Sequence, residues 1–220
     1  MTSNSVRGDT GTVALSMPFD PDLYGALKLT VTHAADGTRS GGMLFEFGNH
    51  IGTHLDAPSH LVPGAASIDQ LPIDQFVGSG AVLHLPRGPN EAVTPDDLER
   101  TKMVEEIGDI VFIGTGWDAW FGKPEYASHH PYLSEDAARW LIDRKVRMVG
   151  MDVQSVDLGH SLRREGFTYT SLRLLLEAGI PVLHGLANLD KIGNRRCELT
   201  AAPICFVGAD GAPTRAFARY

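Results

Sequence analysis

The stretch HIGTHLDAPSH, residues 50–60, places three of the chain's nine histidines and one aspartate in eleven positions. Its pattern is H-x-G-T-H-x-D-x-P-x-H. Gly52 and Pro58 interrupt any helix, and the preceding MLFEFG (43–48) alternates like a strand, so we expect a strand end that runs into a turn. Such a bend can direct several side chains at one point.

The residue types in this stretch indicate a metal site. Imidazole nitrogens and a carboxylate oxygen are the usual ligands of zinc, and they also suit manganese or iron. Two histidines and one carboxylate leave coordination positions open, as a catalytic ion requires. The alternative is a set of hydrogen-bonded polar loop residues. We favour the metal site, because three imidazoles crowded beside a carboxylate bring no packing benefit.

The composition predicts a single globular domain over residues 1–220, since 43% of the residues are hydrophobic and 21% are charged. The net charge of −8 disfavours binding to nucleic acid or to an anionic membrane. No apolar run reaches the roughly 18 residues that span a bilayer. The polar N-terminal sequence lacks the apolar core of a signal peptide, and two cysteines are too few for a disulfide framework. We therefore expect a cytoplasmic protein that acts on a small molecule.

Short apolar runs and helix signals alternate along the chain, which predicts a mixed α/β fold. The expected strands are 12–17, 27–33, 41–48, 80–86, 109–115, 147–153, 180–186 and 202–208. The expected helices are 94–101, 134–146 and 171–179. Thr94 and Asp97 form a capping-box pattern, Ser134 is an N-cap, and Gly179 before Pro181 is a stop signal. Two long loops, 60–72 and 121–134, are expected to shape the site.

Residues 50–60 resemble the signature H-x-G-T-H-x-D-x-x-x-H of the metal-dependent cyclase family, which includes bacterial kynurenine formamidase and isatin hydrolase. Other segments are similar to family segments in the same order, and they extend the resemblance over most of the chain: 71–85, 108–121, 132–157, 174–190 and 208–218. The resemblance implies the family's swivelling β/β/α fold with a mixed β-barrel-like core. It also implies a homodimer or larger homo-oligomer with the site near a subunit boundary.

Carried over to this chain, the resemblance implies that His50, His54 and Asp56 hold the ion and that His60 is the acid and base. A bound divalent ion lowers the pKa of its water from about 16 towards 7. A histidine, with a pKa near 6.5, can take a proton and return it to the leaving nitrogen or oxygen. The implied activity is hydrolysis of a C–N or C–O bond in a small amide, cyclic amide or imide, or lactone.

Two alternatives to this activity stay open. A non-haem metal oxygenase uses the same two-histidine-one-carboxylate ligand set. A catalytically silent metal- or ligand-binding protein would keep the ligands without turnover. His60 favours hydrolysis over oxygenation, because an acid and base beside the ion has less purpose in oxygen activation.

Three further residues are candidates for binding substrate. Gln154 and His160 follow the expected strand 147–153, and His184 lies inside an apolar run, where an imidazole usually has a functional role or a hydrogen bond. Family members with two ions add a histidine and a glutamate, and matching the stretch LRLLLEAGIP places these positions at Leu172 and His184. Leucine cannot bind an ion and imidazole adds no negative charge, so we expect one ion per chain, zinc or manganese. His160 is the alternative source of a second site.

Overall fold

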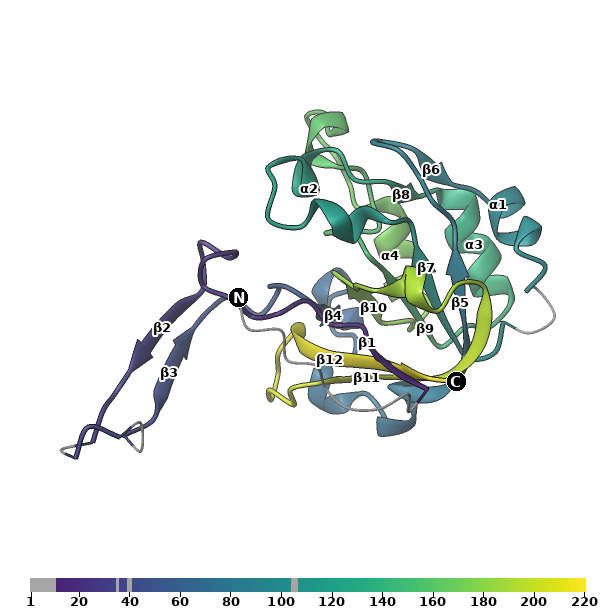
Figure 1. Cartoon of the computed structure of the whole chain (residues 1–220). Helices are drawn as coiled ribbons and strands as arrows, with labels where there is room; N and C mark the ends of the chain where they lie inside the picture. Colours follow the sequence, from purple (N-terminus) through teal and green to yellow (C-terminus); the bar gives the residue numbers. More distant parts are fainter. Residues whose placement is uncertain (1–10, 35, 39–40, 104–106) are drawn as a thin grey trace.

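The computed structural model describes residues 11–34, 36–38, 41–103 and 107–220. Its centre is a mixed sheet in the order β1-β12-β11-β5-β7-β9-β10-β4, and a further pairing of β12 with β4 closes it into a seven-stranded barrel (Figure 1). The barrel strands are β4 (His54–Asp56), β5 (Val77–His84), β7 (Ile110–Gly114), β9 (Met148–Met151), β10 (Val182–His184), β11 (Arg195–Pro203) and β12 (Gly211–Arg219). Strand β1 (Thr12–Ala14) pairs with β12 outside this ring.

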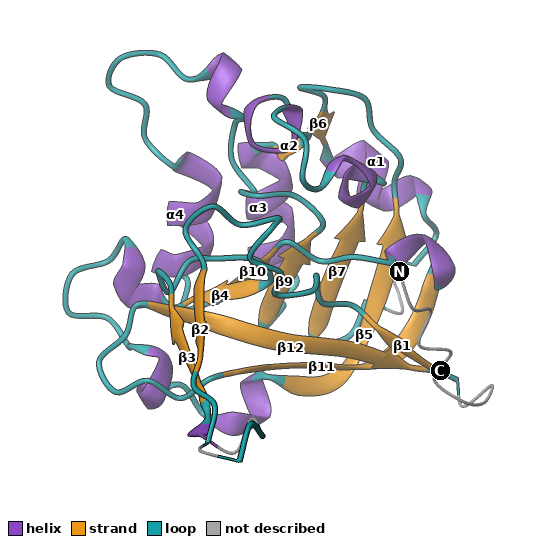
Figure 2. Cartoon of the chain, turned by 60° about the vertical axis from the view of Figure 1, so that its left-hand side comes forward, coloured by secondary structure: helices purple, strands orange, loops and turns teal. Residues whose placement is uncertain are grey.

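The barrel has a parallel and an antiparallel part. Strands β5, β7, β9 and β10 are parallel neighbours, and the remaining pairs of the ring are antiparallel. Parallel strands need long crossovers, and here the crossovers carry α1 (Pro95–Arg100), α3 (Glu135–Asp143) and α4 (Thr170–Glu177). These helices cover one side of the barrel (Figure 2). The mixed barrel with helices outside confirms the expected fold class.

The chain alternates between two hydrophobic cores. Ile110 and Phe112 of β7 point into the barrel, whereas Val111 and Ile113 face the helices. This alternation follows from the two-residue period of a strand, and it places an apolar layer on each side of the sheet. The outer layer carries the loops that surround the candidate site.

The helix signals of the sequence are confirmed. Thr94 and Asp97 form the capping box of α1, and the Ser134 hydroxyl accepts a hydrogen bond from the Ala137 amide at the start of α3, at 3.1 Å. Helix α4 ends before Gly179, which has a φ of +76°. The predicted loop 121–134 also holds α2 (Glu125–Ser128) and β8 (Tyr132–Leu133), which pairs with β6 (Ala92–Val93). Of the helices described, none has the length and apolarity to cross a membrane.

The strand predicted over residues 202–208 is wrong beyond Pro203. Strand β11 ends at Pro203, and the apolar residues after it form a turn in which Val207 is 89% exposed. Strand β12 was not predicted, and most of β11 was missed because charged outward residues such as Arg195 and Glu198 alternate with buried Cys197 and break up the apolar pattern. Strand β4 was not predicted as a separate strand, since its segment was expected to be the end of the preceding strand running into a turn.

A long hairpin leaves the body of the protein. Strands β2 (Lys28–Val31) and β3 (Met43–Glu46) pair antiparallel with each other and project away from the barrel (Figure 1). They confirm the strands expected near residues 27–33 and 41–48. All four residues of β3 are exposed. The hairpin therefore presents apolar side chains that the barrel does not cover.

Candidate metal centre

Two paired strands place the buried part of the site. In β4, Leu55 points into the barrel, so His54 and Asp56 on either side of it point outward. Strand β10 runs antiparallel to β4 with His184 directly opposite His54, and Leu183 of β10 likewise faces the barrel interior. Sheet register thus brings His54, Asp56 and His184 to one outer face, where each is at most 8% exposed.

Four imidazoles surround the Asp56 carboxylate. His50 Nδ1 and His54 Nε2 lie 2.7 and 3.5 Å from Oδ1. His184 Nε2 and His60 Nε2 lie 3.1 and 3.9 Å from Oδ2. Although burial opposes ionisation, the imidazoles of His184 and His50 hold the pKa of Asp56 well below its usual range. The carboxylate is therefore ionised, which is the form that binds a cation.

His54 is held in the form that can bind a metal. Its Nδ1 donates to the Gly52 carbonyl at 2.9 Å, which leaves the Nε2 lone pair directed at the site. Burial lowers the pKa of His54 to about 4, so the ring is neutral near pH 7. Gly52 has a φ of +62°, and a Cβ atom there would lie 2.7 Å from the Tyr24 hydroxyl. Only glycine fits this turn without displacing the aromatic ring.

Sequence reasoning missed Asp210, which precedes β12. Its Oδ2 accepts a hydrogen bond from His60 Nδ1 at 2.8 Å, and its Oδ1 lies 3.1 Å from His50 Nε2. Asn49 also donates to Asp210, at 2.6 Å. The stretch around Asp210 has no ligand spacing, and 150 positions separate it from His60, so no local signal could have identified it.

His50 bridges two carboxylates, Asp56 and Asp210. Burial favours its neutral form, yet the hydrogen bond and the charge of Asp56 raise the pKa of His50 above its ordinary value. As a metal ligand it must give up a proton and one of these hydrogen bonds. An ion bound by His50 would therefore be coupled to the arrangement of Asp210.

The ligand atoms form two compact groups that share Asp56. In the described part of the chain, one group is His50, Asp56 and His60, and the other is His54, Asp56 and His184, with all ligand atoms of a group within 4.8 Å of one another. A neutral imidazole, an ionised carboxylate and further imidazoles at this spacing fit a divalent ion. The structure thus adds His184, a substrate-binding candidate from the sequence, to the immediate surroundings of Asp56.

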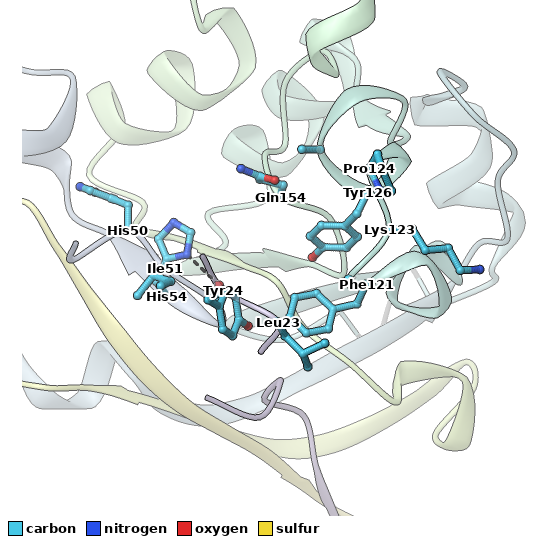
Figure 3. Close-up of a pocket in the computed structure, with 13 residues that line it drawn as sticks. Leu23, Tyr24, His50, Ile51, His54, Phe121, Lys123, Pro124, Tyr126 and Gln154 are labelled. Atoms are coloured by element: carbon cyan, nitrogen blue, oxygen red, sulfur yellow. Dashed lines mark hydrogen bonds between the residues drawn. The ribbon is translucent and has the colours of Figure 1, made fainter. Parts of the chain in front are cut away.

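An aromatic cavity of about 450 Å³ adjoins these ligands. His50 and His54 line one side, and Phe121 and Tyr126 lie across from them (Figure 3). Tyr24 approaches the same space, and so does Gln154 (Figure 3). Planar apolar side chains beside a polar centre are suited to hold a small aromatic molecule.

A second cavity, of about 250 Å³, lies over Asp56. Gln154 lines both cavities, whereas His160 and His184 line this one. Leu172 at the start of α4 is 2% exposed and lines the same cavity. All three substrate-binding candidates from the sequence therefore border the site.

Comparisons with known proteins agree with this geometry. The family model named Cyclase matches residues 13–158. Kynurenine formamidase from Bordetella avium (strain 197N) is 32% identical over 174 residues, which cover 77% of this chain and 76% of that protein. The match to the family model includes the whole stretch 50–60.

Solved structures share the fold over nearly the whole chain. Isatin hydrolase A from Ralstonia solanacearum superposes with a TM-score of 0.80 and 25% identity, covering 94% of this chain and 90% of that one. A protein described as a predicted metal-dependent hydrolase from Bacillus stearothermophilus superposes with a TM-score of 0.72 and 27% identity, covering 94% and 97%.

Proposed function

Since the chain belongs to the Cyclase family and is a metal-dependent hydrolase, we propose that it opens a C–N or C–O bond of a small amide, cyclic amide or imide, or lactone. The observation that carries this proposal is the ionised Asp56 surrounded by four imidazoles at the edge of an aromatic cavity. An ion site and a substrate space therefore adjoin each other.

His50, His54 and Asp56 hold the ion in this proposal. Both imidazoles face the same carboxylate oxygen, Oδ1, which supports a shared ligand role. A divalent ion bound there would lower the pKa of its water, so that hydroxide is available near neutral pH. Zinc and manganese both suit this set of nitrogen and oxygen donors.

His60 is the acid and base. Its Nδ1 is hydrogen-bonded to Asp210, so its Nε2 is the nitrogen directed towards Asp56 and the cavity. A nitrogen in this position can accept a proton from water and return it to the leaving nitrogen or oxygen. Asp210 orients the His60 ring and stabilises the positive charge that forms on it.

The aromatic cavity supports an aromatic substrate. Tyr24, Phe121 and Tyr126 form its apolar walls, and the amide of Gln154 supplies a polar group. A flat ring fused or attached to the scissile carbonyl group fits such walls, because aromatic side chains pack on ring faces and edges. We therefore place aryl amides and ring-fused cyclic amides first among the substrate classes.

Leu172 in the wall of the cavity over Asp56 supports one ion per chain. This buried side chain offers no ligand atom, and the imidazole of His184, 3.1 Å from Asp56 Oδ2, adds no negative charge to offset a second dication. Elemental analysis of protein purified without chelator should return about one equivalent of zinc or manganese. Two equivalents, reduced together by His184→Ala, would contradict a single-ion centre.

The activity is tested with a substrate panel under anaerobic conditions. Formanilide, isatin, phthalimide and dihydrocoumarin represent the amide, cyclic amide, cyclic imide and lactone classes, and product is followed by absorbance. We expect turnover of at least one class without oxygen, loss of turnover with chelator, and recovery with zinc or manganese. Turnover that requires oxygen would indicate an oxygenase, and turnover that survives complete metal removal would overturn the mechanism.

We also propose a homodimer or larger homo-oligomer. The hairpin exposes Leu44 and Phe45 at 65% and 49%, and a cavity of about 430 Å³ beside it is lined by Phe45, Phe47 and Ile204. Contiguous exposed apolar groups mark interaction surfaces. Light scattering should show at least twice the 23.8 kDa of one chain, and a monomer mass at working concentration would contradict the assembly. The cytoplasmic location stays a prediction.

A further inference from the structure

Arg163 lies in the wall of the cavity over Asp56. It is the one lysine or arginine among the described residues that line this cavity. The loop between the 3-10 helix His160–Leu162 and α4 carries it, and the side chain is half-buried. A permanent positive charge therefore faces the space beside the candidate ion site.

The guanidinium group is held in place by neutral partners. Its Nε donates to the Leu158 carbonyl at 2.9 Å, and its Nη1 donates to the Tyr169 hydroxyl at 3.1 Å. Its central carbon lies 4.9 and 5.0 Å from the ring centroids of Phe167 and Tyr169. These contacts fix the orientation of the guanidinium plane and leave the positive charge of Arg163 without a neutralising carboxylate.

Arg163 has no ion-pair partner in the described part of the chain, unlike several other arginines. Arg87, Arg100 and Arg147 each form an ion pair with an aspartate. Across the ranges that the structure describes, no carboxylate oxygen lies within 4.0 Å of an Arg163 nitrogen, and the charge of Arg163 acts on the buried Asp157 only from farther away. Its Nη2 atom makes no hydrogen bond within those ranges. The charge is therefore available to a ligand that enters the cavity.

We propose that Arg163 is the anchor of a carboxylate-binding subsite in the cavity over Asp56. A planar guanidinium pairs with the two oxygens of a carboxylate, and such charge-assisted hydrogen bonds are stronger than neutral ones. The positive charge excludes a cationic ligand. Arg163 acts on the ligand rather than on the ion, so it determines specificity.

The carboxylate can come from two sources, and this part of the inference rests on the proposed function. In hydrolysis of a cyclic amide or lactone, the oxygen of water bonds to the acyl carbon and the bond to nitrogen or ring oxygen breaks. One proton of the water goes to the leaving atom, the other leaves the new acid, and a carboxylate remains. A substrate can also carry a carboxylate of its own.

Binding is tested first, with benzoate and its neutral counterpart benzamide as probes on the zinc-loaded protein. In Arg163→Gln, calorimetry should show a benzoate Kd raised roughly 10- to 100-fold, with the benzamide Kd unchanged. The benzoate Kd of Arg163→Lys should lie between those of the wild type and Arg163→Gln, because lysine keeps the positive charge and lacks the two parallel N–H donors of the guanidinium group. Arg164→Gln is the matched control, since Arg164 is exposed and lines a different surface cavity.

Zinc content and thermal midpoint are measured for every variant, so that a binding change is separated from unfolding or loss of the ion. If Arg163→Gln unfolds, the test uses Arg163→Lys and Tyr169→Phe. The second substitution removes the hydroxyl group that accepts a hydrogen bond from Arg163. Equal weakening of benzoate and benzamide, or equal weakening of benzoate in Arg164→Gln, would overturn the subsite. So would a benzoate Kd that is unchanged in folded Arg163→Gln.

Kinetics then distinguish the two sources. If Arg163 binds the product, Arg163→Gln raises the inhibition constant of 3-(2-hydroxyphenyl)propionate, the acid formed from dihydrocoumarin, and leaves KM for the lactone unchanged. If it binds a substrate carboxylate, KM rises for N-formylanthranilate and stays constant for formanilide. Benzoate binding that depends on Arg163, in a protein that hydrolyses none of these compounds, would contradict the proposed function and leave the subsite intact.

Discussion

The two halves of the metal centre differ in their access to solvent. In the enclosed half, the side chains of His54 and His184 are 10% and 2% exposed, and they stand opposite each other on β4 and β10. In the open half, the side chains of His50, His60 and Asp210 are 27%, 28% and 42% exposed and come from loops and a short 3-10 helix. Asp56 lies between the halves and contacts both.

This difference suits His54 to ion binding and the pair of His60 and Asp210 to proton transfer, while His50 of the open half is also an ion ligand in our proposal. Sheet register fixes the enclosed imidazoles, and burial keeps the pKa of His54 at about 4, so this half supplies a rigid neutral ligand. The open half contains the hydrogen-bonded pair of His60 and Asp210, which water and substrate can reach. Ion binding depends on fixed geometry, whereas proton transfer needs access to the reacting molecule.

Removing the residue that both halves share should have the largest effect. We expect Asp56→Ala to lose the ion and at least about 1,000-fold in activity, because the ion and its activated water are lost together. Elemental analysis and steady-state rates measure both changes. Asp56→Asn, which keeps the shape and removes the charge, should behave similarly. A full equivalent of ion in either variant would show that Asp56 is not a ligand.

His60→Ala should affect the open half alone. Activity should fall about 100-fold while most of the ion stays bound, since a positioned acid and base contributes about this factor. The measurements are kcat and metal content on the same preparation. Metal loss as complete as in Asp56→Ala would place His60 among the ligands and remove the distinction between the halves.

Asp210→Asn should have a smaller effect on the same half. The amide oxygen can still accept a hydrogen bond from His60, but it no longer stabilises the positive charge that forms there, so we expect about a 10-fold loss of kcat with the ion retained. Asn49→Ala is a matched control, because the Asn49 amide donates to Asp210 and to the Gly211 carbonyl and not to His60. A kcat unchanged in Asp210→Asn would contradict the positioning role.

Asp97→Asn, far from both halves, should leave the ion and kcat unchanged. Partial burial opposes its ionisation, yet the Arg87 guanidinium and Thr94 hold the pKa of Asp97 at about 2. Because this pKa is below its unfolded value of about 3.9, the stabilisation is present above that pH and is lost as the pH falls towards 2. In denaturant unfolding, the variant should lose about 1 kcal/mol of its free energy of unfolding at pH 7, because the capping box and the ion pair are weakened. This difference from the wild type should become smaller near pH 2. A pH-independent difference would contradict this linkage.

The sequence by itself determined the features that depend on neighbouring residues. The stretch 50–60 indicated the metal chemistry, because a single bend within eleven positions can direct its four ligand-type side chains at one point. The caps of α1 and α3 followed from Thr94 and Ser134, since a cap joins atoms only a few residues apart. Apolar runs likewise predicted the parallel strands β7, β9 and β10.

Only the tertiary structure decided how distant segments meet at Asp56. Asp210 is 150 positions from His60, and His184 is 128 positions from Asp56. Their contacts depend on the pairing of β4 with both β10 and β12, which closes the barrel. A shift of one residue in this register would turn His184 or Asp56 into the barrel interior, and no pattern within a single segment specifies that alignment.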